Sequence, residues 1–152
     1  MGSKSEMKRL QRRKVEFEQF IQERMPVLVE FCELLKLENP HEVLLDAERF
    51  VWPLHAWLRD ETIKEDDRLW LLVRYNYFIG ELLIQKFGGC WMVDEDPRSQ
   101  LFSNYVVGEF RLLNNKNVKI FPYEIALEFI DHPPGRDLVK LLETVIIQMK
   151  EA

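Results

Sequence analysis

The side chains best suited to chemistry are few, and their spacing matches no familiar catalytic pattern. The three histidines, His41, His55 and His132, are far apart in the chain. None of them has another histidine, a cysteine or a carboxylate at a metal-ligand spacing such as His-Glu-x-x-His. His55 lies near Trp52 and Trp57, and such an aromatic setting can bring a histidine to titrate near neutral pH. We expect His55 to be a hydrogen-bonded boundary residue, with a titrating role as the alternative.

The sequence also contains no motif typical of a catalytic nucleophile or of a phosphate-binding loop. The two cysteines, Cys32 and Cys90, are too few for a disulfide framework and lack the neighbouring ligands of a zinc site. We expect both to be buried, reduced and slow to react. No Gly-x-Ser-x-Gly motif is present, and no Lys-Ser or Lys-Thr follows Gly88-Gly89. We therefore assign no catalytic residue, metal or cofactor, and we rank a binding function above an enzyme.

Two acidic clusters are the candidate sites for a protein partner. The first, Asp94-Glu95-Asp96, follows a predicted strand, supplies too few oxygens for a calcium loop, and is expected to form an exposed loop. The second lies in a polar connection close to a pair of tryptophans that would supply desolvated contacts. Together the candidate partner-binding residues are Asp94, Glu95, Asp96, Trp52, Trp57, Asp60, Glu61 and Glu65. We favour the first cluster because a sheet edge is more rigid than a loop between helices; a solvated loop is the alternative.

Asn76 is the one amide predicted to lie on the buried side of a helix. A buried amide is normally hydrogen-bonded, so we expect it to anchor a neighbouring backbone, with ligand contact as the alternative. Two further functions are compatible with the sequence. One is an enzyme whose site is assembled from scattered residues such as His55, Asn76, Glu81 and Asp94. The other is a structural subunit of a larger assembly.

Charge and composition narrow the class of partner. The chain has 152 residues, of which 47% are apolar and 31% charged, so it is long enough for one domain with a substantial core. The net charge is −5, but the first 24 residues are basic, and the other 128 sum to −8. An acidic surface disfavours nucleic acid and attracts basic partners. The longest stretch without a charged residue, Ser99–Gly108, is too short to span a membrane, and we expect a cytoplasmic protein of undetermined oligomeric state.

Hydrophobic periodicity predicts a predominantly helical α+β domain over 1–152, with residues 1–4 disordered. Pro26 is expected to kink the first helix or to divide it into two abutting helices. Asn39 is expected to cap the second helix, and Pro53 to bend or end that helix near Trp52. The predicted helices cover 5–36, about 40–58 with the bend or end near Trp52, 68–87, 122–130 and 136–150. The predicted strands form a small antiparallel sheet and cover 90–93, 105–112 and a short 118–121.

The helix over 68–87 is expected to be the central, largely buried element. Its polar residues, Arg74, Glu81 and Gln85, make only a narrow stripe. Gly88 is expected to end it in the left-handed conformation. Gly80 lies within it, where a missing side chain allows another element to approach closely.

Three short segments resemble a pattern found in a family of small uncharacterised bacterial proteins. The segments are Gly80-Glu81, Phe87-Gly88-Gly89-Cys90-Trp91 and Ile120-Phe121-Pro122-Tyr123-Glu124. In that family a helix bearing Gly-Glu or Gly-Tyr runs into Gly-Gly-x-Trp, and an Asn-Pro-Phe-like or Phe-Pro-Phe-like turn begins a helix after the sheet. The resemblance covers about 75–142 and implies no catalytic residues. Some of these proteins lie beside toxins, so it implies an immunity-type inhibitor or accessory protein, here one that acts on a basic partner.

Overall fold

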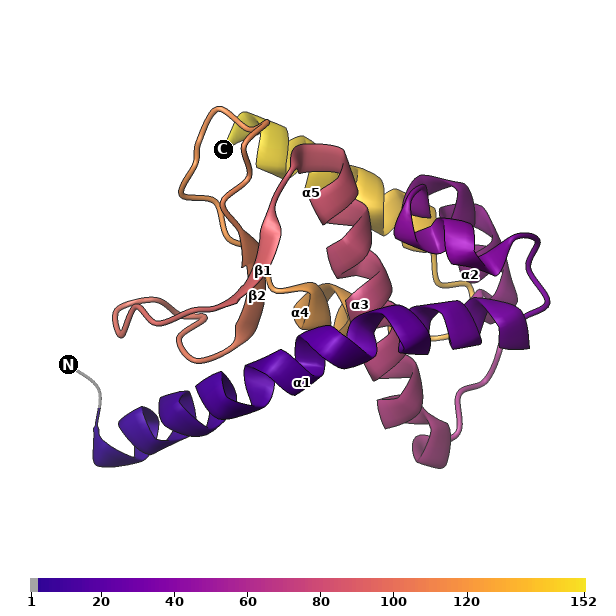
Figure 1. Cartoon of the computed structure of the whole chain (residues 1–152). Helices are drawn as coiled ribbons and strands as arrows, with labels where there is room; N and C mark the ends of the chain where they lie inside the picture. The colour runs from indigo at the N-terminus through magenta and orange to yellow at the C-terminus, as the bar shows by residue number, and fades with distance from the viewer. Residues whose placement is uncertain (1–2) are drawn as a thin grey trace.

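The computed structural model of the protein describes residues 3–152 as helices around a small antiparallel sheet (Figure 1). The α-helices are α1 (Lys4–Leu34), α2 (Val51–Leu58), α3 (Glu65–Phe87), α4 (Pro122–Ile130) and α5 (Leu138–Glu151). The strands are β1 (Cys90–Val93) and β2 (Tyr105–Gly108), and two 3₁₀ helices, η1 (Pro40–Leu44) and η2 (Ala47–Phe50), precede α2. The predicted α+β fold class, mostly helical with a small antiparallel sheet, is confirmed. Among residues 3–152, no helix is both long and apolar enough to cross a bilayer.

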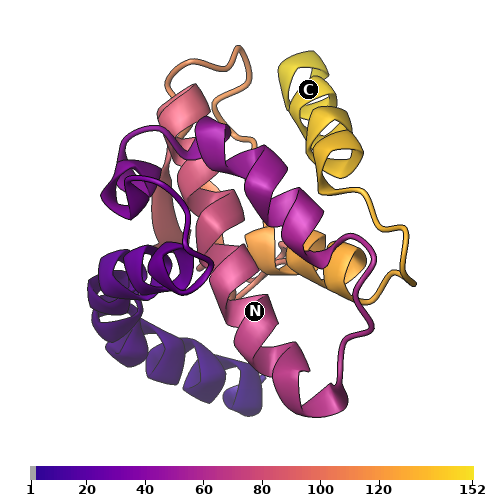
Figure 2. The ribbon, with the colours of Figure 1, turned by 90° about the vertical axis from the view of Figure 1, so that its right-hand side faces the viewer.

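Helix α3 runs through the middle of the molecule, as its composition predicts. Figure 2 shows α1 on one side of α3 and α5 on the other, and α4 packs closely along α3. Twelve residues of α3 are buried, which is why the helix is apolar on most of its circumference. The acidic first turn at Glu65, Asp66 and Asp67 suits the positive end of the helix dipole. Gly88 ends the helix with φ 70°, the left-handed cap expected from the sequence.

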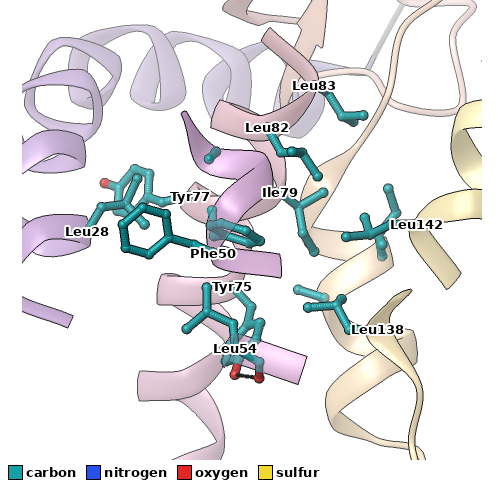
Figure 3. Packing of buried hydrophobic residues seen from close by; sticks show 14 of the residues in the cluster. Leu28, Phe50, Leu54, Tyr75, Tyr77, Ile79, Leu82, Leu83, Leu138 and Leu142 are labelled. Carbon is teal, nitrogen blue, oxygen red and sulfur yellow. Dashed lines mark hydrogen bonds between the residues drawn. The ribbon is translucent and has the colours of Figure 1, made fainter. Parts of the chain in front are cut away.

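The core forms where α1, α2 and α5 meet α3 (Figure 3). Leu28 of α1, Leu54 of α2 and Leu138 of α5 are all fully buried in this cluster. The Tyr75 hydroxyl, completely buried on α3, donates to the carbonyl oxygen of Leu54 at 2.8 Å. A buried hydroxyl needs such a partner, so this bond lets a polar group sit inside the core and holds α2 against α3.

The hairpin is shorter than its sequence pattern predicts. Cys90 pairs with Gly108 and Val93 with Tyr105 in antiparallel register. The predicted strand over 105–112 ends at Gly108 because the next residue, Glu109, has φ 55° and leaves the extended conformation. The predicted third strand is reduced to a single bridge between Val107 and Ile120.

The first half of the chain departs from prediction at Asn39 and at Pro53. Helix α1 continues through Pro26, so it is not divided into two abutting helices there. Of the helix predicted to follow Asn39, the part from Val51 to Leu58 forms α2, and the part before it forms η1 and η2. Asn39 adopts φ 49° and its side chain caps no backbone amide, so the predicted cap is wrong. Pro53 lies in the first turn of α2, where a missing amide hydrogen costs little, so it does not end a helix there. The predicted disorder is wrong for Ser3, which caps α1, and for Lys4; residues 1–2 lie outside the described part of the chain.

Gly80 lies where Trp91 of the hairpin packs against α3. A Cβ atom at Gly80 would lie 1.9 Å from Cζ2 of Trp91, so only glycine admits the indole ring at this position. The ring is held there by its Nε1, which donates to Glu81 Oε2 at 3.3 Å, and by Phe20, whose ring centroid lies 4.9 Å away. Burial raises the pKa of Glu81, although Arg24 and Trp91 both favour its charged form. The predicted close approach at Gly80 is confirmed.

Candidate functional site

The acidic cluster favoured from the sequence is not the exposed loop that was expected. Asp94 is completely buried, and its Oδ1 accepts from Lys119 Nζ at 3.0 Å and from the backbone amide of Asp96 at 3.1 Å. Burial alone would raise the pKa of Asp94, but the hydrogen bonds, including that from Lys119, outweigh it and lower the pKa. Glu95, which is exposed, forms an ion pair with Lys14 of α1 at 3.0 Å. The expectation of exposure is therefore wrong at Asp94, which holds this corner of the hairpin together.

The second cluster borders a groove between the end of α1, the end of α2 and the beginning of α3. We call it the acidic-aromatic groove; it is lined by Leu34, Trp57, Leu58, Glu61, Thr62, Ile63, Asp66, Asp67, Trp70 and Leu71. Its volume is about 510 Å³, within the range of roughly 300–1,000 Å³ usual for ligand sites. The groove combines apolar walls with three carboxylates.

Phe31 positions the two tryptophans of the groove. Its ring is 1% exposed and lies edge-on to both Trp57 and Trp70, at centroid separations of 5.7 Å and 5.6 Å. Both indoles nevertheless remain accessible, with exposures of 40% and 37%, and Leu34 beside them is 62% exposed. Buried on one side and open on the other, these indoles form a fixed apolar surface.

Arg136 holds the loop that carries Glu61. Its guanidinium is almost fully buried and donates to the carbonyl oxygens of Leu58 and Glu61. The backbone amides of Gly135 and Arg136 both donate to the carbonyl oxygen of Arg59, at 2.8 Å and 3.2 Å. The connection between α4 and α5 thus satisfies carbonyls at the end of α2 that have no helical partner. Glu61 is consequently presented from a tethered backbone.

The charged residues that line the groove are all acidic, and one cation, the Arg74 guanidinium, lies over the Trp70 ring. Glu61, Asp66 and Asp67 line it, and no basic residue does. Among residues 3–152, none of these three carboxylates forms an ion pair, whereas neighbouring acids are paired: Asp60 with Arg59 and Asp131 with Arg68. Paired charges largely neutralise one another, so the groove is where the negative field of this surface is left available.

Only two of the candidate residues from the second cluster line the groove, namely Trp57 and Glu61. Trp52 is 62% exposed and lies against the ring of His55, with centroids 5.1 Å apart. Asp60 and Glu65 are exposed next to the groove without lining it.

Asp66, Asp67 and Trp70 also line the groove and are not among the candidates from the sequence, although their spacing carries a signal. Asp66 precedes Trp70 by four residues and Asp67 precedes it by three, and such spacings put side chains on one face of a helix. The local sequence does not show that Trp57 and Trp70 lie together, because this arrangement depends on Phe31 from a third helix.

The residues named for a scattered catalytic site are not gathered. His55 is buried, and its Nδ1 accepts from the Leu138 amide at 3.1 Å at the start of α5. Asn76 lines a second pocket, separate from the acidic-aromatic groove, and none of His55, Glu81 and Asp94 lines it. Asn76 Oδ1 is buried and accepts no hydrogen bond from the described residues, so the expectation that the amide oxygen anchors a neighbouring backbone is wrong. Among residues 3–152, no group of three or more His, Cys, Asp or Glu side chains is arranged to hold a metal ion.

The cysteines differ from one another in exposure. Cys32 is buried, and burial raises the pKa of its thiol to about 11. Cys90 is exposed, so the expectation that both are buried is wrong for this residue. Its pKa is raised by partial burial and by Glu109, whose carboxylate accepts a hydrogen bond from the thiol at 3.3 Å. Neither environment favours the thiolate form that a nucleophile requires.

Comparison with protein-family models, with curated proteins and with solved structures finds no match to the chain.

Proposed function

We propose that the protein is a protein-binding module whose acidic-aromatic groove receives an arginine-bearing segment of a basic partner, in the manner of an immunity-type inhibitor or accessory protein. The observation that carries this proposal is the composition of the groove: two accessible indoles and three unpaired carboxylates, with no lining cation. A guanidinium can stack on an indole and donate to carboxylates at the same time.

The surroundings of Trp70 supply an internal example of this contact. The Arg74 guanidinium lies 4.0 Å from the centre of the Trp70 ring, and its Nη1 donates to the Trp70 carbonyl oxygen at 3.0 Å. The acidic charge outside the first 24 residues supports the same class of partner, because long-range attraction accelerates the encounter with a basic protein. The aromatic walls would then supply the desolvated part of the contact.

The four indole N–H signals of the ¹⁵N-labelled protein give a direct test. The probe is an acetylated hexapeptide of alternating leucine and arginine, and the control peptide has citrulline, which keeps the shape and loses the charge, in place of each arginine. We expect the signals of Trp57 and Trp70 to shift with the arginine peptide. Trp52, which is exposed outside the groove, and Trp91, which is buried against Gly80, are expected not to shift.

The outcomes separate the proposal from non-specific attraction. Equal shifts with the citrulline peptide would show that charge plays no part in the contact. Shifts confined to Trp52 would locate binding away from the groove. Either result contradicts the proposed function.

A further inference from the structure

A second pocket lies between α1, α3, β2 and the beginning of α4. Its volume is about 470 Å³, and five aromatic side chains line it: Phe20, Tyr77, Tyr105, Phe121 and Tyr123. It shares no lining residue with the acidic-aromatic groove. Aromatic walls of this kind are suited to a flat ring rather than to a flexible chain.

Hydrogen bonds to α1 hold the walls of this pocket in place. The Tyr77 hydroxyl donates to the carbonyl oxygen of Phe20 at 2.8 Å, and the Tyr105 hydroxyl donates to that of Arg13 at 2.7 Å. Burial raises the pKa of Tyr77 to about 12, so its hydroxyl stays protonated and keeps donating at neutral pH. The Phe20 ring lies 4.7 Å from Tyr77 and 4.6 Å from Tyr105, measured between centroids. The aromatic surface is therefore formed without a ligand.

Asn76, on the side of α3 that faces this pocket, is polar and unsatisfied. The residue is 8% exposed, and its Oδ1 is buried with no hydrogen-bond donor among the described residues. Leaving a buried acceptor unpaired costs stability, and native proteins do so rarely. The missing partner is an N–H or O–H group, which a bound molecule can supply. The amide nitrogen of the same side chain offers a donor beside it.

Arg13 gives the pocket an available positive charge. Its guanidinium lies 5.2 Å from the centre of the Tyr105 ring, and within residues 3–152 it forms no ion pair. Glu23 also lines the pocket, but it is exposed and already accepts from Gln19 Nε2 at 2.9 Å. An anionic group of a ligand can therefore be bound by Arg13.

We propose that this pocket binds an adenine mononucleotide. The base lies between the aromatic walls, Asn76 Oδ1 accepts from the exocyclic amine of adenine, and Asn76 Nδ2 donates to N7, the pairing that an asparagine amide makes with adenine. Stacking on aromatic side chains supplies the part of the affinity that does not depend on which base is bound. The phosphate is bound by Arg13.

Three compounds that differ by single groups test the assignment by calorimetry. We expect adenosine monophosphate to bind with a sub-millimolar Kd, and inosine monophosphate, whose carbonyl replaces the amine, to bind at least tenfold more weakly. Adenosine, which lacks the phosphate, is expected to bind at least threefold more weakly. No binding of adenosine monophosphate at 5 mM, or equal binding of the inosine compound, overturns the proposal. Equal binding of adenosine overturns the assignment of a nucleotide.

Two variants distinguish recognition by Asn76 from a structural role. Asn76→Leu keeps the volume and removes the unpaired acceptor, so we expect an unchanged or higher Tm and at least tenfold weaker binding of adenosine monophosphate. Full affinity in this variant overturns the proposal. Arg13→Gln is expected to lower the affinity for the nucleotide to that for adenosine and to leave adenosine binding unchanged. If this variant binds adenosine monophosphate as tightly as the wild type does, the binding of the phosphate by Arg13 is contradicted. Asn114→Leu, in an exposed turn, is the matched control.

Nucleotide binding at this pocket does not depend on the protein partner proposed for the acidic-aromatic groove. Because the two sites share no residue, neutralising the carboxylates of the acidic-aromatic groove is expected to leave nucleotide binding unchanged.

Discussion

At the residue scale, the contact between Gly80 and Trp91 sets how closely the hairpin approaches α3. The indole of Trp91 has little room to move away, because the residue is only 6% exposed and its ring is hydrogen-bonded to Glu81 and packed on Phe20. The space that other helices fill with a side chain at this position is occupied here by an aromatic ring. Overpacking such a site forces the backbone or the ring to move.

Gly80→Ala is expected to lower the free energy of unfolding by about 1–3 kcal/mol, the usual cost of overpacking. This loss is expected even though alanine is the better helix former by about 1 kcal/mol. Urea unfolding measures the change. The control is the same substitution in a Trp91→Leu background, where the ring carbon that clashes is absent and the cost of alanine is expected to disappear. An equal cost in both backgrounds would show that the indole is not what excludes a side chain.

The two thiols are expected to differ in reactivity because they differ in exposure. In the native protein at pH 8 a maleimide reagent should label Cys90 and leave Cys32 unmodified until the chain unfolds. Glu109 raises the pKa of Cys90, so Glu109→Gln lowers that pKa, increases the thiolate fraction and accelerates labelling. Mass spectrometry over a time course measures both rates. Labelling of Cys32 at the rate of Cys90 would contradict its burial.

At the element scale, most of the long helices can be predicted from the sequence, whereas short elements depend on tertiary contacts. The apolar run over 68–87 and the glycine that follows it predict α3 and its end because both signals are local. The segment after Asn39 has a good start signal but folds as η1 and η2, since packing against α1 decides its backbone. The early end of β2 depends on the positive φ of Glu109, for which the alternating pattern carries no sign.

The candidate sites likewise combine features that can be predicted from the local sequence with features that depend on tertiary contacts. The i, i+4 spacing of Asp66 and Trp70 is visible in the sequence, but their meeting with Trp57 requires α1 to supply Phe31. The burial of Asp94 could not be predicted from a run of acidic residues, because it depends on Lys119 reaching it from a distant segment. An amide without a partner, such as Asn76, is likewise a property of the packed structure alone.

The corner formed by Asp94 and Lys119 is expected to make the hairpin sensitive to acid. Hydrogen bonds lower the folded-state pKa of Asp94 below the ordinary 3.8, so its stabilisation is present above about pH 4 and is lost as the pH falls through the folded-state pKa. Asp94→Asn should cost about 1–3 kcal/mol at pH 7, and the deficit should shrink toward pH 2. Thermal unfolding across this pH range measures it.

Glu95→Gln is the matched control for Asp94→Asn. It removes one neighbouring carboxylate whose ion pair with Lys14 is solvent-exposed, so it should cost less than about 1 kcal/mol. A deficit for Asp94→Asn that does not change with pH would contradict a charged, hydrogen-bonded Asp94 in the folded protein.

At the scale of the whole molecule, the two pockets present opposite chemistries on separate surfaces. The acidic-aromatic groove offers carboxylates and indoles to a cation, while the pocket at Asn76 offers an amide and Arg13 to a small polar ring. Helix α3 contributes to both, with its first turns lining the groove and its middle lining the other pocket. We propose that the groove recognises positive charge through Glu61, Asp66 and Asp67.

The most direct measurement is the affinity of the leucine–arginine hexapeptide, by calorimetry, for two variants that lose the same charge. Glu61→Gln, Asp66→Asn and Asp67→Asn together neutralise the groove; Glu124→Gln, Glu143→Gln and Glu151→Gln together neutralise three exposed carboxylates outside it. We expect the first variant to bind at least tenfold more weakly than the wild type, a loss of about 1.4 kcal/mol, and the second less than twofold more weakly. Equal weakening of both would make the groove one part of a diffuse negative field and would contradict specific recognition of positive charge by the groove.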